Sequence, residues 1–151
     1  MTQTEFRCEV HEGLAVNMEY NARQGSENRL DYELSWLQRM HMIEDTLAKI
    51  EARLGKTGVL TKEQRAELLG LLSTLKIEIG EFSKTHSEQA QSITAFTQAS
   101  THEATRLQRD PQLLRLSLEG LSTSVQGFET SHPKLVEIVN AISLMLSNSG
   151  V

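Results

Sequence analysis

The chain has one cysteine, two prolines and few aromatic residues, and the scarcity of cysteine and of aromatic residues limits how the fold can be stabilised. A single cysteine, Cys8, excludes an internal disulfide and is typical of proteins in a reducing compartment. Aromatic residues make up 5% of the 151 residues, so a core has to be built mainly from Leu, Ile and Val. A domain of this length buries roughly two-thirds of its unfolded surface, which is enough for stability without disulfides or metals.

Long apolar runs and basic segments are missing as well. No stretch approaches the roughly 18 apolar residues of a membrane-spanning helix, and the first residues lack the apolar segment of a signal peptide. The net charge is −5 and the isoelectric point is near 5.5, with no segment basic enough to displace counterions from nucleic acid. We therefore expect a cytoplasmic protein that binds neither nucleic acid nor a membrane.

Catalytic and cofactor motifs are also absent: no dinucleotide or phosphate loop, nucleophile elbow or His-Glu-x-x-His motif occurs. Glu129 and His132 have the Glu-x-x-His spacing of di-iron bundles, but once only and across a predicted helix boundary. Cys8 and His11 would supply two of the four ligands that a structural zinc site needs. We expect no enzyme activity, no metal and no cofactor.

What the chain does contain is four sets of large apolar residues spaced by alternating steps of four and three. They are Trp36, Met40, Ile43, Leu47, Ile50 and Leu54; Leu68, Leu72, Leu75, Ile79 and Phe82; Leu114, Leu118, Leu121, Val125 and Phe128; and Leu135, Val139, Ile142 and Leu146. At about 100° per residue, each set lies on one helical face. The pattern predicts an all-α fold of antiparallel helical hairpins, either a four-helix bundle or an elongated coiled-coil-like assembly. No internal repeat of identical residues is expected.

Turn and capping residues predict the helix boundaries. Residues 1–27 are interpreted as a weakly helical or flexible arm, followed by a helical domain over 28–151 with helices at about 28–54, 62–108, 111–129 and 133–147. The first helix is expected to end at Gly55, a residue that suits a left-handed C-cap. The capping residues that we predict for the other helices are Thr61 with Gln64 as a capping box, Asp110 with Pro111, Ser131 or His132 with Pro133, and Gly150 at the C-terminal end.

Two features of these helices leave alternatives open. Residues 62–108 keep one face in phase and contain no proline, and no glycine follows Gly80, which favours one continuous helix. The alternative is a break between residues 83 and 92, where the sequence is polar throughout. Gly120 and Gly127 in the third helix fit either a close approach of a neighbouring helix or a solvated face.

The C-terminal region carries a resemblance to a known family. The string Phe128-Glu129-Thr130-Ser131-His132-Pro133-Lys134-Leu135 is followed by Ile138, Ile142, Leu146 and a terminal Gly150-Val151. This pattern, with the leucine-rich hairpin before it, resembles a family of short, uncharacterised bacterial helical proteins described only as a domain of unknown function. The resemblance covers residues 30–151 and implies a small all-helical fold, with no known activity, substrate or cofactor.

The first helix gives the main indication of function. Leu30, Leu34 and Leu37 form a second apolar group, about 100° to 160° around the helix from the main stripe. A helix with two apolar sides needs two covers, so this group is a candidate interaction surface. We expect a non-enzymatic module that associates with itself or with a partner helix. The alternative is a ligand- or metal-binding helical bundle with a sensory or redox role.

Overall fold

Helices are the only regular secondary structure in the residues that the computed structural model describes, namely 29, 31 and 33–149. A first helix covers residues 33–56. It is followed by α2 (Lys62–Ser83), α3 (Ser87–Thr105), α4 (Pro111–Ser124) and α5 (Pro133–Asn148). The predicted all-α fold is confirmed.

The chain divides into two units, residues 1–37 and residues 38–151. The second unit holds the four helices α2–α5 together with residues 38–56 of the first helix. The predicted N-terminal arm, residues 1–27, lies outside the described residues.

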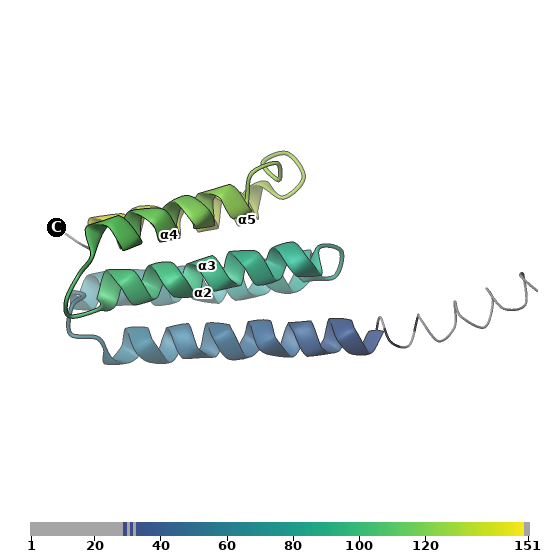
Figure 1. Cartoon of the computed structure of the whole chain (residues 1–151), viewed down its shortest axis with the longest axis horizontal. Coiled ribbons are helices and arrows are strands. Elements are labelled where there is room, and N and C mark those ends of the chain that lie inside the picture. Colours follow the sequence, from purple (N-terminus) through teal and green to yellow (C-terminus); the bar gives the residue numbers. More distant parts are fainter. Residues whose placement is uncertain (1–28, 30, 32, 150–151) are drawn as a thin grey trace, which may run out of the picture. The chain divides into compact units, whose positions relative to one another are not determined.

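Within the second unit, successive helices run antiparallel and lie in three layers (Figure 1). Residues 38–56 form one outer layer, the α2–α3 hairpin the middle layer and the α4–α5 hairpin the other outer layer. The two hairpins meet through α3 on α4 and through α2 on α5. The middle layer is therefore covered on both of its faces, whereas the α4–α5 hairpin is covered on one.

The core lies between these layers and follows the predicted apolar stripes. The most deeply buried large side chains are Phe82, Leu47, Ile50, Leu54, Leu68, Leu72, Leu75, Ile79, Ile93, Leu121, Leu135 and Ile142. The spacing of four and three places these side chains on the inward face of each helix, where burial of one of them contributes about 1.5–3 kcal/mol.

Three helix starts have the predicted residues in place. The Thr61 hydroxyl accepts from the backbone N–H of Gln64 at 3.2 Å, and the Gln64 side chain accepts from the backbone N–H of Thr61 at 3.0 Å. The Asp110 carboxylate accepts from two backbone N–H groups at the start of α4, at 3.0 and 3.2 Å. Pro111 and Pro133 each occupy the first turn, where a missing N–H costs nothing.

Other boundaries differ from the predictions. The prediction of one continuous helix over 62–108 is wrong, because α2 ends at Ser83 and α3 begins at Ser87. The helix over 111–129 ends early, at Ser124, and a turn with Gly127 at φ 91° follows. Hydroxyl groups near the end of α4 bond to their own backbone carbonyls, and such residues are weak helix formers.

Two predicted caps are also corrected. The first helix runs through Gly55 to Lys56, and Gly127 is the residue with positive φ among the described ones. His132 occupies the N-cap position of α5 but makes no side-chain capping bond, because its ring packs on aromatic neighbours instead. The Ser131 hydroxyl bonds to the His132 ring nitrogen Nδ1 at 3.0 Å and leaves the helix start uncapped. Gly150 lies outside the described residues.

Candidate functional site

The two hairpins α2–α3 and α4–α5 are built to one pattern. A shift of 46 residues, from Leu68 to Leu114, aligns three leucines, a phenylalanine and a histidine with identical residues. The aligned pairs are Leu68 and Leu114, Leu72 and Leu118, Leu75 and Leu121, Phe82 and Phe128, and His86 and His132. The expectation of no internal repeat is therefore wrong. The signal that sequence reasoning missed is Phe-x-x-Thr-His recurring as Phe-x-x-Ser-His.

The recurring motif makes the same turn twice. The backbone N–H of His86 donates to the carbonyl of Phe82 at 2.9 Å, and that of His132 donates to the carbonyl of Phe128 at 2.8 Å. The backbone angles also agree, with φ −133° and ψ 58° at His86 and φ −136° and ψ 62° at His132. Each histidine Nδ1 lies against the hydroxyl of the preceding residue.

The four rings of these turns form one cluster at the same end of the unit. Phe82 stacks on His86 with ring centroids 4.8 Å apart and meets Phe128 edge to face at 4.9 Å. The two histidine rings lie 5.6 Å apart, nearly perpendicular. Such edge-to-face pairs contribute about 0.5–1.5 kcal/mol each beyond the area they bury. The cluster joins the turns of the two hairpins and has the character of packing rather than of a catalytic pair.

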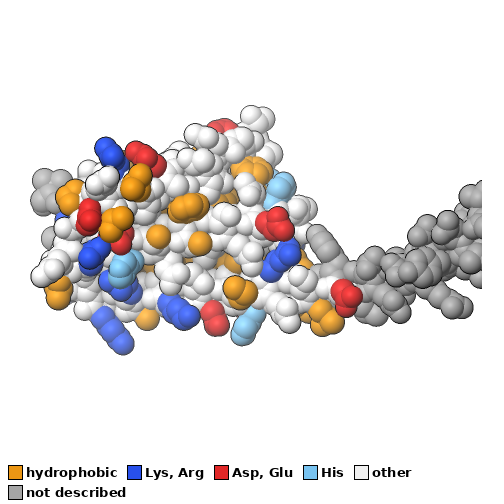
Figure 2. Space-filling view, in the orientation of Figure 1, with side chains coloured by type: hydrophobic (Ala, Val, Ile, Leu, Met, Phe, Trp, Pro, Cys, Tyr) orange, Lys and Arg blue, Asp and Glu red, His pale blue; other side chains and the backbone are white. Residues whose placement is uncertain are grey.

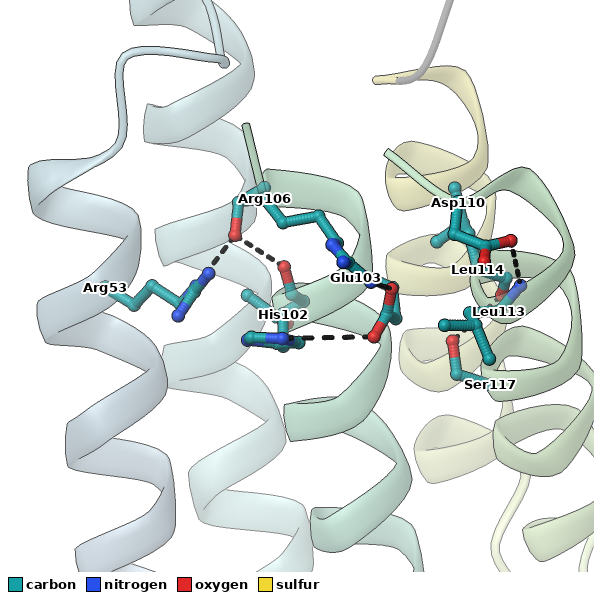
Figure 3. A network of polar contacts seen from close by, with 10 residues as sticks. Arg53, His102, Glu103, Arg106, Asp110, Leu113, Leu114 and Ser117 are labelled. Carbon is teal, nitrogen blue, oxygen red and sulfur yellow. Dashed lines mark hydrogen bonds and ion pairs between the residues drawn. The ribbon is translucent and has the colours of Figure 1, made fainter. Parts of the chain in front are cut away.

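Charged residues gather at the opposite end of α3 (Figure 3). The Arg53 side chain, from the first helix, donates to the Thr105 hydroxyl at 2.8 Å. Arg106 donates to Glu103 at 2.9 Å, and this hydrogen bond, more than the charge of Glu103 itself, raises the pKa of the Arg106 guanidinium above its usual range. His102 lies 3.9 Å from the same carboxylate. The Arg53–Thr105 contact ties α3 to the first helix, whereas the two contacts of Glu103 are local to the end of α3.

The helix α3 buries hydroxyl groups where the other helices bury aliphatic side chains. Each of its four buried threonines donates to the carbonyl four residues earlier, at 2.6–2.8 Å, and these threonines are Thr94, Thr97, Thr101 and Thr105. A hydroxyl that bonds to its own helix needs no partner from outside. The interior of α3 is thus polar in composition and largely satisfied in its hydrogen bonds.

Gly120 on α4 lies directly under the Phe96 ring of α3. A β-carbon added at Gly120 would stand 2.3 Å from Phe96 Cε1, which is far inside van der Waals contact. Of the two interpretations left open for this glycine, the close approach of a neighbouring helix is the one that the structure supports. Gly127 has open space around it and a φ of 91°, so its role is the left-handed turn after α4.

A groove of about 900 Å³ runs along the outer face of the α4–α5 hairpin. Its apolar lining consists of Leu114, Leu118 and Leu144, together with Pro111. Leu144 is 63% exposed, although it belongs to an otherwise well-packed helix. The Ser143 hydroxyl, which also lines the groove, is buried and has no hydrogen-bond partner within the described part of the chain. The groove has the mixed apolar and polar lining of a binding surface.

A further set of large apolar side chains is exposed on the α3–α4 side. Apolar side chains gather over these two helices in Figure 2. They include Phe96 on α3 and Leu113 and Leu116 on α4, which are 38%, 43% and 48% exposed, and Leu107 in the connecting loop, 95% exposed. We call Phe96, Leu113 and Leu116 the α3–α4 patch.

The predicted interaction surface falls in the other unit. Leu34 and Leu37 are 60% and 55% exposed, and Leu30 lies outside the described residues. Both residues belong to the unit of residues 1–37.

The residues of the metal hypothesis are not assembled into a site. The Glu129 carboxylate accepts from the backbone N–H of Gly127 at 2.9 Å, whereas His132 packs in the ring cluster. Across residues 29, 31 and 33–149, no three His, Cys, Asp or Glu side chains stand close enough to hold a metal ion. Cys8 and His11 lie outside the described residues.

None of the helices that the structure describes combines the length and the apolar character needed to cross a membrane. No protein-family model, no characterised protein and no solved structure matches this chain.

Proposed function

We propose that this chain is a non-enzymatic, cytoplasmic helical module whose function is to associate with itself through apolar surface that its own bundle does not use. The α3–α4 patch is the observation that carries this proposal. Its three members, Phe96, Leu113 and Leu116, are large, apolar and 38–48% exposed on two helices that pack on each other. Contiguous exposed apolar surface of this kind marks sites of association in soluble proteins.

The geometry of the patch supports an interface. Gly120 admits the Phe96 ring against the backbone of α4, and Leu116 precedes Gly120 by one helical turn. The ring therefore packs close to the backbone of α4 at Gly120, while the Phe96 side chain stays 38% exposed. An aromatic side chain anchored in this way loses little conformational freedom when a partner covers it. Aromatic residues are correspondingly enriched in interfaces.

The test is the absolute molar mass in solution, measured by light scattering on a sizing column over a dilution series. We expect a mass above that of the monomer, 16.9 kDa, which falls only on strong dilution. The double variant Leu113→Glu with Leu116→Glu should weaken self-association at least about tenfold, because each change removes an apolar contact from the interface. Ile77→Glu is the matched control, since Ile77 is 67% exposed on α2, outside the patch.

A second double variant, Leu34→Glu with Leu37→Glu, distinguishes the two apolar surfaces. If it dissociates the oligomer and the α3–α4 variant does not, then the interface is the surface predicted from the first helix. A protein that stays monomeric at every concentration contradicts self-association altogether. Elemental analysis of natively purified protein separates the metal-binding alternative, which requires a stoichiometric metal.

A further inference from the structure

A small cleft between the first helix and α3 is lined by basic side chains from both helices. Its volume is about 150 Å³, and its lining consists of Lys49, Ile50, Arg53, Gln98, Thr101 and His102. Three of these residues are basic and none is acidic. One buried water needs about 10–15 Å³, so the cleft has room for a small ion together with water. All of its lining belongs to the unit of residues 38–151.

The cleft has a buried floor and a basic mouth. Ile50 and Thr101 form the floor, where they are 1% and 2% exposed. The side chains of Lys49, Arg53 and His102 are exposed around it. Figure 3 shows Arg53 and the ring of His102 approaching the space between the first helix and α3 from opposite sides. The basic groups therefore converge on one place, although they come from two separate helices.

The Arg53 guanidinium is held in position by α3. Its Nε donates to the Thr105 hydroxyl at 2.8 Å, and that hydroxyl donates to the carbonyl of Thr101 at 2.6 Å (Figure 3). The two Nη groups of Arg53 form no hydrogen bond within the described part of the chain. A guanidinium that is fixed at Nε and open at both Nη groups can donate two parallel hydrogen bonds to one oxyanion.

Lys49 adds a second charge that no neighbour neutralises. Lys49 and Arg53 are four residues apart on one helical face, where like charges repel. Neither of them forms an ion pair with any carboxylate that the structure describes. An anion bound between them would turn this repulsion into two attractions, and the amide of Gln98 can donate to the same anion.

One carboxylate borders the cleft without lining it. Glu103 lies 3.9 Å from His102 and accepts from Arg106 at 2.9 Å. The charge of Arg106 offsets that of Glu103, so Glu103 does not cancel the positive charge of the lining. Two fixed positive charges, on Lys49 and Arg53, favour a divalent anion over a monovalent one.

A second cleft continues the first along the same two helices. Its volume is about 240 Å³, and its lining consists of Met42, Ile43, Thr46, Gln91, Thr94, Ala95 and Gln98. Gln98 lines both clefts, which therefore adjoin. The lining of the second cleft has no charged side chain and includes Met42, which is 60% exposed. A ligand with a phosphate group and a short alkyl chain would meet a basic and an apolar section in succession.

We propose that the cleft formed by Lys49, Arg53 and His102 binds a small divalent oxyanion, namely inorganic phosphate or the phosphate group of a small organic ester. Because the site joins residues 38–56 to α3, the bound anion also stabilises the packing of the first helix on the α2–α3 hairpin. This inference goes beyond the proposed self-association and does not depend on the α3–α4 patch.

The first probe is inorganic phosphate, titrated into the full chain at constant ionic strength with chloride as the balancing anion. Amide NMR spectra of isotopically labelled protein follow the titration and include the Nε–H of Arg53 and the side-chain amide of Gln98. We expect saturable shifts centred on residues 49–53 and 98–102. We also expect a higher thermal unfolding midpoint in phosphate than in chloride, since the ligand binds the folded chain.

The variants Lys49→Gln and His102→Gln test the two sides of the cleft. Both side chains are exposed, so the folded chain should tolerate the changes, and an unchanged circular dichroism melt in chloride verifies this. We expect Lys49→Gln to weaken phosphate binding at least about tenfold, because it removes a charge-assisted hydrogen bond, and His102→Gln to weaken it by a smaller factor. The matched control is Lys76→Gln, at an exposed lysine of α2, which should bind phosphate as the wild type does.

Butyl phosphate is the second probe and distinguishes the two sources of the phosphate group. Tighter binding than that of inorganic phosphate supports an organic ester that extends into the second cleft. Equal binding supports the free ion.

Two results would overturn the inference. The first is shifts that do not saturate, or that chloride produces equally, since these report only ionic screening. The second is saturable binding that Lys49→Gln and His102→Gln both leave unchanged, which places the anion elsewhere. Failure of the proposed function reads out separately, because its test measures molar mass in variants of the α3–α4 patch.

Discussion

The hairpins α2–α3 and α4–α5 share their leucines and their turn, yet their second helices bury different kinds of side chain. In α3 five of the eight buried positions carry hydroxyl groups, and the other three are two alanines and one isoleucine. In α5 they are leucine, isoleucine and valine, as at Leu135 and Ile142. The difference follows from the number of neighbours. The helix α3 contacts the first helix, α2, α4 and α5, whereas α5 has its outer side on the groove.

This contrast shows how one hairpin pattern serves two environments. A helix enclosed on several sides needs small side chains so that its neighbours can approach closely, and the buried threonines of α3 supply small size while their hydroxyls donate to their own helix. A helix with one packed face can use large aliphatic residues to fill that face. The first prediction below changes equivalent positions in the two hairpins, the second compares a glycine of α2 with one of α4, and the third compares two threonines within α3.

The largest difference is expected between Leu68→Ala and Leu114→Ala. Leu68 is 2% exposed, and its loss should reduce the free energy of unfolding by about 2–5 kcal/mol through lost burial and a cavity. Leu114 is half-buried beside the groove, where water can fill the space, so the cost should be about 1–2 kcal/mol. Urea unfolding followed by circular dichroism measures both. Equal losses would contradict the difference in burial between these two leucines.

An intermediate effect of opposite sign is expected for two helical glycines. In Gly120→Ala the new methyl group meets the Phe96 ring, and overpacking should cost about 1–3 kcal/mol, of which better helix propensity returns about 1 kcal/mol. Gly70 of α2 has nothing within 4 Å, so Gly70→Ala should raise the free energy of unfolding by about 1 kcal/mol. Thermal melts of the two variants should shift in opposite directions. A stabilised Gly120→Ala would mean that the ring moves aside freely.

The smallest effect concerns the hydroxyl groups of α3. Thr105→Val removes the acceptor of Arg53, leaving a partly buried guanidinium without that bond, and should cost about 1 kcal/mol. Thr97→Val removes only a bond from the hydroxyl to its own helix, so the change in unfolding free energy should stay within about 0.5 kcal/mol. The denaturant midpoints of the two valine variants measure both changes in the free energy of unfolding. A cost at Thr97 equal to that at Thr105 would contradict the self-satisfied hydroxyls.

The fold class and several helix starts could be predicted from the sequence because they depend on local signals. The apolar spacing defines a helical face, and the capping box at Thr61 and the prolines at 111 and 133 act within one turn. The break between Ser83 and Ser87 carries no proline or glycine, so the polar sequence over 83–92 left it only as an alternative. Alignment with the second turn, where Pro133 follows the same geometry, would have favoured the break.

The candidate sites were harder to predict, because they depend on which faces are left uncovered. The groove lining combines residues of α4 and α5 that are about 30 positions apart, such as Leu114 and Leu144, and no local pattern links them. Gly120 shows the same limit: the sequence left its two interpretations open, and its contact with Phe96 exists only once α3 lies on α4. The surface at Leu34 and Leu37 stays a prediction.

The four buried threonines of α3 have a consequence for how this sequence can change in evolution. Each hydroxyl hydrogen is engaged by its own backbone, so a neighbouring helix meets mainly methyl groups and oxygen lone pairs. Exchange between Thr and Val at Thr94, Thr97 and Thr101 should therefore cost little, whereas a longer side chain would clash with the neighbouring helices. Thr105 differs because its hydroxyl also accepts from Arg53. Related sequences are therefore best recognised by a helix in which the residues at every third and fourth position keep the same size while their hydropathy varies.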